Sequence, residues 1–241
     1  MAEPFLIAHR GDSENAPENT LTAFRKALEI DPPPDFIELD VHLSRDGEIV
    51  VMHDPSLDRT TDGHGLLVEL PWREISAFFA SYLQVHAKRF LDERIPRLRD
   101  VLDLVAGTNV GLMIEVKSAQ ATETVLSLFR KHSQESEHII ASFDLQVLET
   151  AAQISPDVQR LWLVDVLRDD RIEAVSKLDV AIVGAGRRTS YDCIKRLQQN
   201  RKQVWIWTVD SESEALRFAS WKVDGLVTNR PRVVRSLLRK G

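Results

Sequence analysis

The stretch FLIAHRGDSENAPENTLTAFRKALEIDPPPDFIELDV, residues Phe5–Val41, holds one full repeat of the pattern that decides the fold. It begins with a short apolar run, Phe5–Ala8, and ends with another, Phe36–Val41. Between them, apolar residues three and four positions apart predict an amphipathic helix, with Asn19 as its expected N-cap. Near-continuous apolar strands joined by a helix are typical of a parallel sheet whose faces are covered by helices.

The same alternation continues along the chain. The apolar runs lie at residues 5–8, 36–41, 111–116, 138–142, 160–164, 180–184, 204–209 and 225–228. Eight such units in a chain of 241 residues predict an α/β protein with the (β/α)8, or TIM, barrel fold. A doubly wound open sheet is the alternative, and it is weakened because no G-x-G-x-x-G follows any of the runs.

One further apolar run, Glu48–His53, breaks this alternation. Its connection to the preceding run is too short for a parallel crossover, so the two should pair as an antiparallel hairpin. Asp46-Gly47 predicts a two-residue turn, and in that register Asp40 lies directly opposite His53 on the same face. We therefore expect the hairpin to bring His53 to the end of the second strand.

The composition favours a single globular domain over residues 1–241, in which an insertion of about residues 45–95 caps the C-terminal mouth of the barrel. Hydrophobic residues make up 43% of the chain, charged residues 28%, and the net charge is −6. No basic cluster or long apolar run predicts a nucleic-acid partner or a stable membrane association. The single cysteine, Cys193, and the lack of a signal-peptide pattern favour a cytoplasmic protein. The sequence indicates no particular oligomeric state.

Charged residues interrupt the apolar runs at one end only. In a (β/α)8 barrel the active site lies at the C-terminal ends of the strands. Period-two alternation places Glu38 and Asp40 on one face of the second strand. The candidate site residues at these strand ends, together with one aromatic residue expected near the mouth, are His9, Arg10, Glu38, Asp40, Glu115, Lys117 and Trp207.

These residue types predict a metal site beside an anion. Three carboxylates, Glu38, Asp40 and Glu115, offer the oxygen ligands that suit one Mg²⁺ or Ca²⁺ better than Zn²⁺. Arg10 and Lys117 next to them predict contacts with a phosphate group, and Trp207 is expected to line the substrate pocket. His9 and His53 then remain as a general acid and a general base. The other histidines are interpreted as wall, structural or solvated residues: His42, His64, His86, His132 and His138.

The motifs resemble those of one known family over nearly the whole chain. They are HRGxxxxAPENT (9–20), ELDV (38–41), DGxxVVMHD (46–54), LDRTTxGxG (57–65), IEVK (114–117), SFD (142–144), WTV (207–209) and DGLVTNRP (224–231). In this order and combination they are similar to the glycerophosphodiester phosphodiesterases. The resemblance implies a (β/α)8 barrel with an insertion after the second strand, and it implies the same roles for the site residues named above.

The implied reaction is hydrolysis of a small glycerophosphodiester to glycerol 3-phosphate and an alcohol, which belongs to glycerol and lipid metabolism. The nucleophile is either water or the substrate 2-hydroxyl, and the sequence does not assign the acid and base roles between the two histidines. A lysophospholipase D or sphingomyelinase D-like enzyme and a metal-dependent barrel isomerase or lyase are the alternatives. One departure is Asp210, where the family motif WTVN reads WTVD.

Overall fold

The strands close into a barrel. The computed structural model describes residues 3–80, 90–132, 138–168 and 172–239. Within these residues eight parallel strands form a ring, because β1 pairs with both β2 and β9. In ring order they are β1 (Phe5–His9), β2 (Phe36–Leu43), β4 (Gly111–Val116), β5 (Ile139–Ser142), β6 (Gln159–Val164), β7 (Ile182–Gly186), β8 (Gln203–Trp207) and β9 (Gly225–Thr228). The predicted barrel is confirmed, and closure excludes the open sheet.

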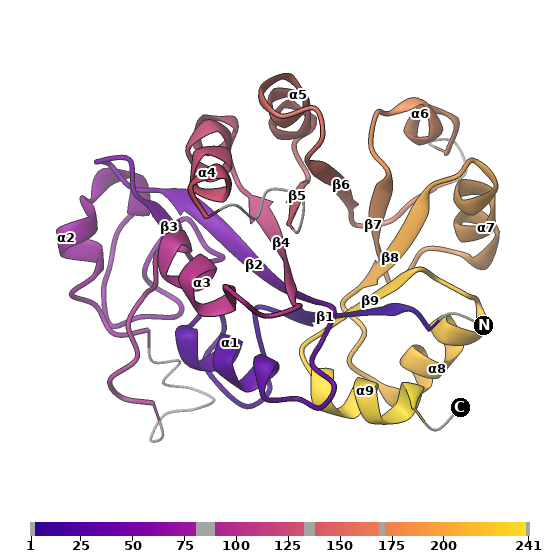
Figure 1. Cartoon of the computed structure of the whole chain (residues 1–241), viewed down its shortest axis with the longest axis horizontal. Coiled ribbons are helices and arrows are strands. Elements are labelled where there is room, and N and C mark those ends of the chain that lie inside the picture. The colour runs from indigo at the N-terminus through magenta and orange to yellow at the C-terminus, as the bar shows by residue number, and fades with distance from the viewer. Residues whose placement is uncertain (1–2, 81–89, 133–137, 169–171, 240–241) are drawn as a thin grey trace.

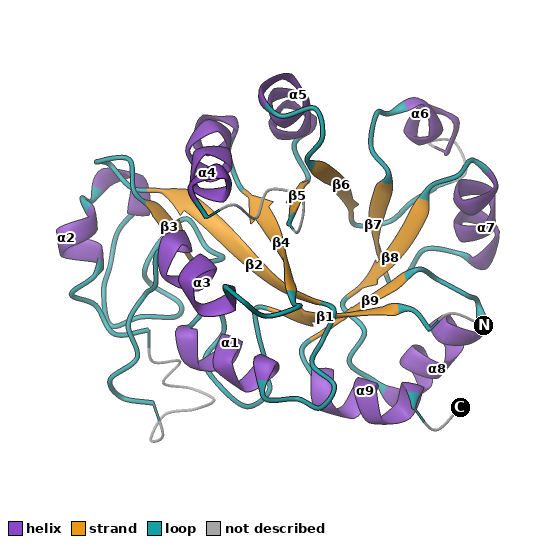
Figure 2. Ribbon diagram, viewed as in Figure 1, coloured by secondary structure: helices purple, strands orange, loops and turns teal. Residues whose placement is uncertain are grey.

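Helices surround the ring of strands on its outside, as Figures 1 and 2 show. They are α1 (Leu21–Leu28), α3 (Leu98–Val105), α4 (Ala119–Lys131), α5 (Leu145–Ile154), α6 (Ile172–Lys177), α7 (Tyr191–Gln199), α8 (Glu212–Ser220) and α9 (Pro231–Leu238). None of the described helices combines the length and the apolar character needed to span a membrane.

The first helix begins one residue later than the sequence predicts. Thr20 is its N-cap, and the Thr20 hydroxyl accepts a hydrogen bond from the backbone N–H of Ala23. The predicted cap, Asn19, is wrong, because this residue has a φ of 58° and turns its side chain away from the helix. The amide of Asn19 instead donates a hydrogen bond to the carboxylate of Asp40 in β2.

The core has an inner and an outer layer. The barrel interior is filled by apolar side chains from alternate strand positions, among them Ile7, Met113, Leu161, Ile182 and Val227. Phe36 and Trp205 pack with their ring centroids 5.2 Å apart in the same interior cluster. Leu39 and Val41 face the outer helices, which leaves Glu38 and Asp40 on the inner face as predicted.

The hairpin forms, but with another register. β3 (Ile49–Val51) runs antiparallel to β2 with His42 opposite Val50, and Met52 donates its N–H to the carbonyl of Asp40. The predicted pairing of Asp40 with His53 is therefore wrong by one residue. The cause is a turn of three residues instead of two, in which Gly47 has a φ of 85° and Ser44 N–H donates to Glu48 O.

The segment that follows β3 forms a small apolar cluster of its own. It contains the short helices η1 (Leu67–Glu69) and α2 (Trp72–Ile75). Together with Val50 of β3, the buried side chains of this cluster are Met52, Leu57, Leu67, Ile75, Ala80 and Ile95. In Figure 1 this segment lies beside β2 and β3, at the left of the view. Tyr82 and His86 lie outside the described residues. The single-domain organisation with the insertion over the mouth stays a prediction.

Candidate active site

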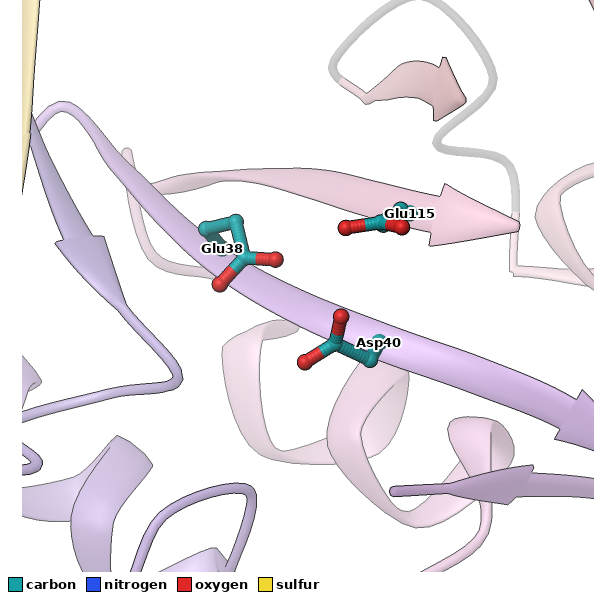
Figure 3. A group of neighbouring side chains, drawn as sticks. All are labelled: Glu38, Asp40 and Glu115. Atoms are coloured by element: carbon teal, nitrogen blue, oxygen red, sulfur yellow. The ribbon is translucent and has the colours of Figure 1, made fainter. Parts of the chain in front are cut away.

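Three carboxylates meet at the C-terminal ends of β2 and β4. The strand register places Asp40 directly beside Glu115, and Glu38 lies two positions earlier on the same face of β2. Figure 3 shows the three carboxylates of Glu38, Asp40 and Glu115 beside one another over these two strands. One oxygen from each lies within 4.8 Å of the others. The structure thus brings together the three acidic residues that the sequence analysis selected as metal ligands.

Burial makes this acidic group electrostatically unfavourable by itself. Glu38 and Asp40 are 3% and 1% exposed. Burial and the neighbouring Asp40 carboxylate raise the pKa of Glu38 well above its ordinary value, and the same two causes raise the pKa of Glu115 to about 7. Burial would also raise the pKa of Asp40, but Lys117 and Arg10 outweigh it and lower that pKa.

Two cations border the carboxylates. The ammonium of Lys117 lies 2.6 Å from Asp40 Oδ1 and 2.5 Å from Glu115 Oε1. Arg10 places its Nε 3.3 Å from Asp40 Oδ2, and its backbone N–H donates to Glu38 Oε2 at 2.9 Å. When all three carboxylates are ionised, as metal binding requires, they exceed these two cations by one negative charge. A buried, oxygen-only donor set with surplus negative charge fits a hard divalent cation.

His9 is fixed by residues from the far end of the chain. Its Nδ1 lies 2.6 Å from the amide oxygen of Asn229, and the amide nitrogen of Asn229 donates to Asp210 at 2.8 Å. That amide presents its oxygen to the imidazole, and an amide oxygen can only accept a hydrogen bond. Nδ1 of His9 therefore carries the proton, and Nε2 is unprotonated. Burial, with help from Arg10, lowers the pKa of His9 to about 4, which keeps the ring neutral.

His53 reaches the same region by another route than the predicted one. The ladder between β2 and β3 ends at Val51, so strand alternation no longer decides where the side chain points. Nδ1 of His53 lies 2.6 Å from Asp54 Oδ1, and the carbonyl of His53 is hydrogen-bonded by Nε2 of His42 at 3.0 Å. His53 still lowers the pKa of Asp40 through its charge, after the larger effects of Lys117 and Arg10.

Trp207 lies at the mouth of the barrel as expected. Its indole N–H donates to the carbonyl of Gly184 at 3.0 Å, and its ring packs edge-on against Phe143 at 5.5 Å. The ring borders a hollow of about 480 Å³ whose wall also includes Arg188 and Asp210. Asp210 also accepts a hydrogen bond from Asn229, so this hollow adjoins the residues that hold His9 in place.

Several residues that support the site are not among the candidates predicted from the sequence. The amide of Asn19 donates to Asp40 Oδ2 at 2.9 Å, and its oxygen accepts the backbone N–H of Asp40 at 3.3 Å. Asn229 orients His9 through a hydrogen bond to its Nδ1, and Asp210 in turn holds the amide of Asn229. Asn229 stands at a strand end, a signal that could have marked it, whereas Asn19 carries the features of an ordinary helix cap.

A closed (β/α)8 barrel with a carboxylate cluster, two cations and two histidines at its strand ends has the groups that phosphoester hydrolysis requires. The family model described as the glycerophosphoryl diester phosphodiesterase family matches residues 9–233. The glycerophosphodiester phosphodiesterase of Caldanaerobacter subterraneus subsp. tengcongensis is 30% identical over 246 residues, with 98% of each chain covered. That of Bacillus subtilis is 28% identical, over 93% of this chain and 83% of the relative.

Solved structures agree with these sequence matches. An Oleispira antarctica phosphodiesterase in complex with the product sn-glycerol-3-phosphate superposes with a TM-score of 0.90 at 27% identity, covering 98% of this chain and 97% of the other. A glycerophosphodiester phosphodiesterase from Agrobacterium tumefaciens gives 0.83 at 26%, covering 97% and 99%. The chain is thus a phosphoric diester hydrolase built on a (β/α)8 barrel. It belongs to the glycerophosphoryl diester phosphodiesterase family.

Proposed function

We propose that this protein hydrolyses glycerophosphodiesters to glycerol 3-phosphate and an alcohol, in a metal-dependent reaction in which His9 and His53 transfer the protons. The observation that carries the proposal is the buried group of Glu38, Asp40 and Glu115, bordered by two cations and lying within electrostatic range of both histidines. The relatives named above support the substrate class.

Glu38, Asp40 and Glu115 would hold one divalent cation, Mg²⁺ or Ca²⁺. When bound, such an ion supplies positive charge that polarises the phosphoryl oxygens and stabilises the charge that develops on them. The ion would leave the site with one positive charge in excess, and a phosphodiester monoanion would neutralise it. Arg10 and Lys117, which border the carboxylates, would contact the phosphate group. Trp207, on the wall of the hollow that also includes Asp210, would contact the rest of the substrate.

The two histidines differ in their surroundings, and this supports a division of roles. His9 is neutral, with its proton held on Nδ1 by Asn229, so Nε2 is available to accept a proton from the nucleophile. The Asp54 carboxylate holds Nδ1 of His53, which leaves Nε2 of that ring to donate a proton to the leaving oxygen. The nucleophile is water or the 2-hydroxyl of the substrate, and the second route passes through a cyclic phosphate.

A direct assay tests the proposal. Release of glycerol 3-phosphate is measured from glycerophosphocholine and glycerophosphoethanolamine, and release of choline from lysophosphatidylcholine and sphingomyelin, each in EDTA and after adding Mg²⁺ or Ca²⁺. Metal-dependent release from the two glycerophosphodiesters supports the proposal. Turnover of the lipids alone would make the protein a lysophospholipase D or sphingomyelinase D-like enzyme. Phosphorus-31 NMR during turnover detects a cyclic phosphate if the 2-hydroxyl attacks.

The proposal places the enzyme in the cytoplasm, acting on small molecules of glycerol and lipid metabolism without a nucleic-acid or membrane partner. The single buried thiol of Cys193 is compatible with a reducing compartment.

A further inference from the structure

Two residues that have no role in the proposed chemistry, Glu18 and Arg59, meet in space. Glu18 belongs to P-E-N-T (Pro17–Thr20), directly before α1, and Arg59 belongs to D-R-T-T (Asp58–Thr61), in the insertion. The guanidinium of Arg59 donates two hydrogen bonds to the Glu18 carboxylate, of 3.0 Å to Oε2 and 2.8 Å to Oε1. This two-point contact joins segments 41 residues apart.

On its other side, Arg59 holds the partner of His53. Its Nε lies 2.6 Å from Asp54 Oδ2 and its Nη2 lies 2.9 Å from Asp54 Oδ1, which makes a second two-point contact. Asp54 Oδ1 is also the atom that lies 2.6 Å from Nδ1 of His53. Arg59 therefore fixes the plane of the carboxylate that orients this imidazole.

On its other side, Glu18 holds the predicted phosphate contact. Its Oε1 accepts a hydrogen bond of 2.8 Å from Nη1 of Arg10, whose Nε faces Asp40 at 3.3 Å. The contacts thus form an unbroken path from His53 through Asp54, Arg59 and Glu18 to Arg10. We call the pair of Glu18 and Arg59 the ion-pair bridge.

Arg10 and His53, the two residues that the ion-pair bridge connects, differ in how firmly the sheet holds them. Arg10 directly follows β1, and its backbone N–H is bonded to Glu38 in the neighbouring strand. His53 lies two residues beyond the end of β3, and its side chain is 37% exposed. Because no strand ladder reaches His53, side-chain contacts must define its position relative to the carboxylate cluster.

The bridge stays charged over a wide pH range. Burial would raise the pKa of Glu18, but the hydrogen bonds from Arg59 and the charge of Arg10 lower it. Hydrogen bonds from Arg59 lower the pKa of Asp54 to about 2. The contacts should therefore persist at any pH at which the enzyme is folded and active.

We infer that Glu18 and Arg59 are positioning residues, which set the distance and the orientation of His53 relative to Arg10 across the carboxylate cluster. The inference deepens the proposed function and rests on it for the roles of His53 and Arg10. The side chain of Arg59 is 38% exposed and that of Glu18 is 17% exposed. A surface ion pair contributes only about 0–1 kcal/mol to stability, so loss of this partly exposed pair should leave the fold intact. Displacing a proton donor by about 1 Å, by contrast, can lower turnover by roughly 100-fold.

The test compares Arg59→Ala and Glu18→Gln with Arg99→Ala as the matched control. Arg99 also pairs with a carboxylate, since its Nη2 donates to both oxygens of Glu48 at 2.6 and 2.9 Å, and it is 44% exposed, against 38% for Arg59. With glycerophosphocholine and Mg²⁺ we expect Arg59→Ala to lower kcat roughly 10- to 100-fold with little change in KM. Glu18→Gln should lower it less, and Arg99→Ala should leave it within about twofold of the wild type.

Two further variants separate geometry from charge. Arg59→Lys keeps the positive charge but cannot make both two-point contacts, so it should remain impaired. The double variant with Glu18→Gln and Arg59→Ala should lose less activity than the product of the two single losses, because both changes break the contact between Glu18 and Arg59. Wild-type kcat in Arg59→Ala, full activity in Arg59→Lys, or losses that multiply in the double variant would overturn the inference.

A measurement without substrate separates this inference from the proposed function. Nitrogen-15 NMR of the imidazole of His53 reports its hydrogen bond to Asp54. The resonances should shift in Arg59→Ala and Glu18→Gln but not in Arg99→Ala, and identical spectra in all variants would refute the bridge. A wild-type protein that hydrolyses no glycerophosphodiester would refute the proposed function, while the spectra would still decide on the bridge.

Discussion

His9 and Asn229 share a hydrogen bond of 2.6 Å although they lie 220 positions apart in the sequence. The contact exists because β1 pairs with β9 when the barrel closes, which brings the first and last strand ends together. Asp210, in the loop after the neighbouring strand β8, holds the amide of Asn229 in the orientation that fixes the proton of His9.

Replacing Asn229 by Ala should therefore disable His9 without removing it. The imidazole loses the acceptor that holds its Nδ1 proton, so we expect kcat to fall about 100-fold, as for a misplaced catalytic group. Steady-state kinetics with glycerophosphocholine check this, with Asn200→Ala as the control. Asn200 also uses its side-chain amide in a hydrogen bond, to Arg196 O at the end of α7. Equal activity of the two variants would contradict the role of Asn229.

Removal of divalent metal should lower both activity and stability. The three buried carboxylates repel one another, so a bound cation stabilises the folded protein by mass action. We expect EDTA to abolish turnover and Mg²⁺ or Ca²⁺ to raise Tm. Glu115→Gln should reduce this rise, whereas Glu212→Gln, at an exposed position of α8, should not change it. A Tm that does not respond to either metal would contradict a metal site at these residues.

Acid should selectively remove the contribution of Asp54 to stability. Hydrogen bonds from Arg59 lower the pKa of Asp54 in the folded protein to about 2, from an ordinary value of 3.8. A lowered carboxyl pKa stabilises the folded state above pH 3.8, and this contribution disappears as the pH falls towards 2. Urea unfolding should show the wild type more stable than Asp54→Asn from pH 7 to about 4, with the difference shrinking at lower pH. A difference that stays constant down to pH 2.5 would contradict this assignment.

Gly47→Ala should destabilise the hairpin of β2 and β3. Gly47 has a φ of 85° and no atom within 4 Å of where a Cβ would lie, so the effect would arise from backbone strain alone. We expect a loss of about 1 kcal/mol in the free energy of unfolding, measured by urea denaturation. An unchanged midpoint would mean that the turn differs from the three-residue form described above.

The barrel and its acidic site follow from patterns that are local in the sequence. Apolar runs alternating with helices predicted the strands, and period-two alternation alone placed Glu38 and Asp40 together. The hairpin register did not follow, because Asp46-Gly47 suits a two-residue or a three-residue turn. Side-chain hydrogen bonds from Ser44 to Asp46 and from the N–H of Glu48 to Ser44 accompany the longer form.

The residues that support the site could not be predicted for a different reason. Asn229 and Arg59 act through partners far away in the chain, and only closure of the barrel and folding of the insertion bring those partners near. His53 was selected as a candidate on a register that the structure contradicts. Its place near Asp40 depends on side-chain contacts beyond the end of β3.

The central claim is that this site hydrolyses glycerophosphodiesters with a bound divalent cation and with His9 and His53 as proton carriers. The most direct test measures glycerol 3-phosphate released from glycerophosphocholine by the wild type, His9→Ala and His53→Ala, each in Mg²⁺, in Ca²⁺ and in EDTA. We predict metal-dependent release by the wild type, and losses of at least about 100-fold in both variants while substrate binding persists. Full activity of the wild type in EDTA, or near-normal turnover in both histidine variants, would contradict the account.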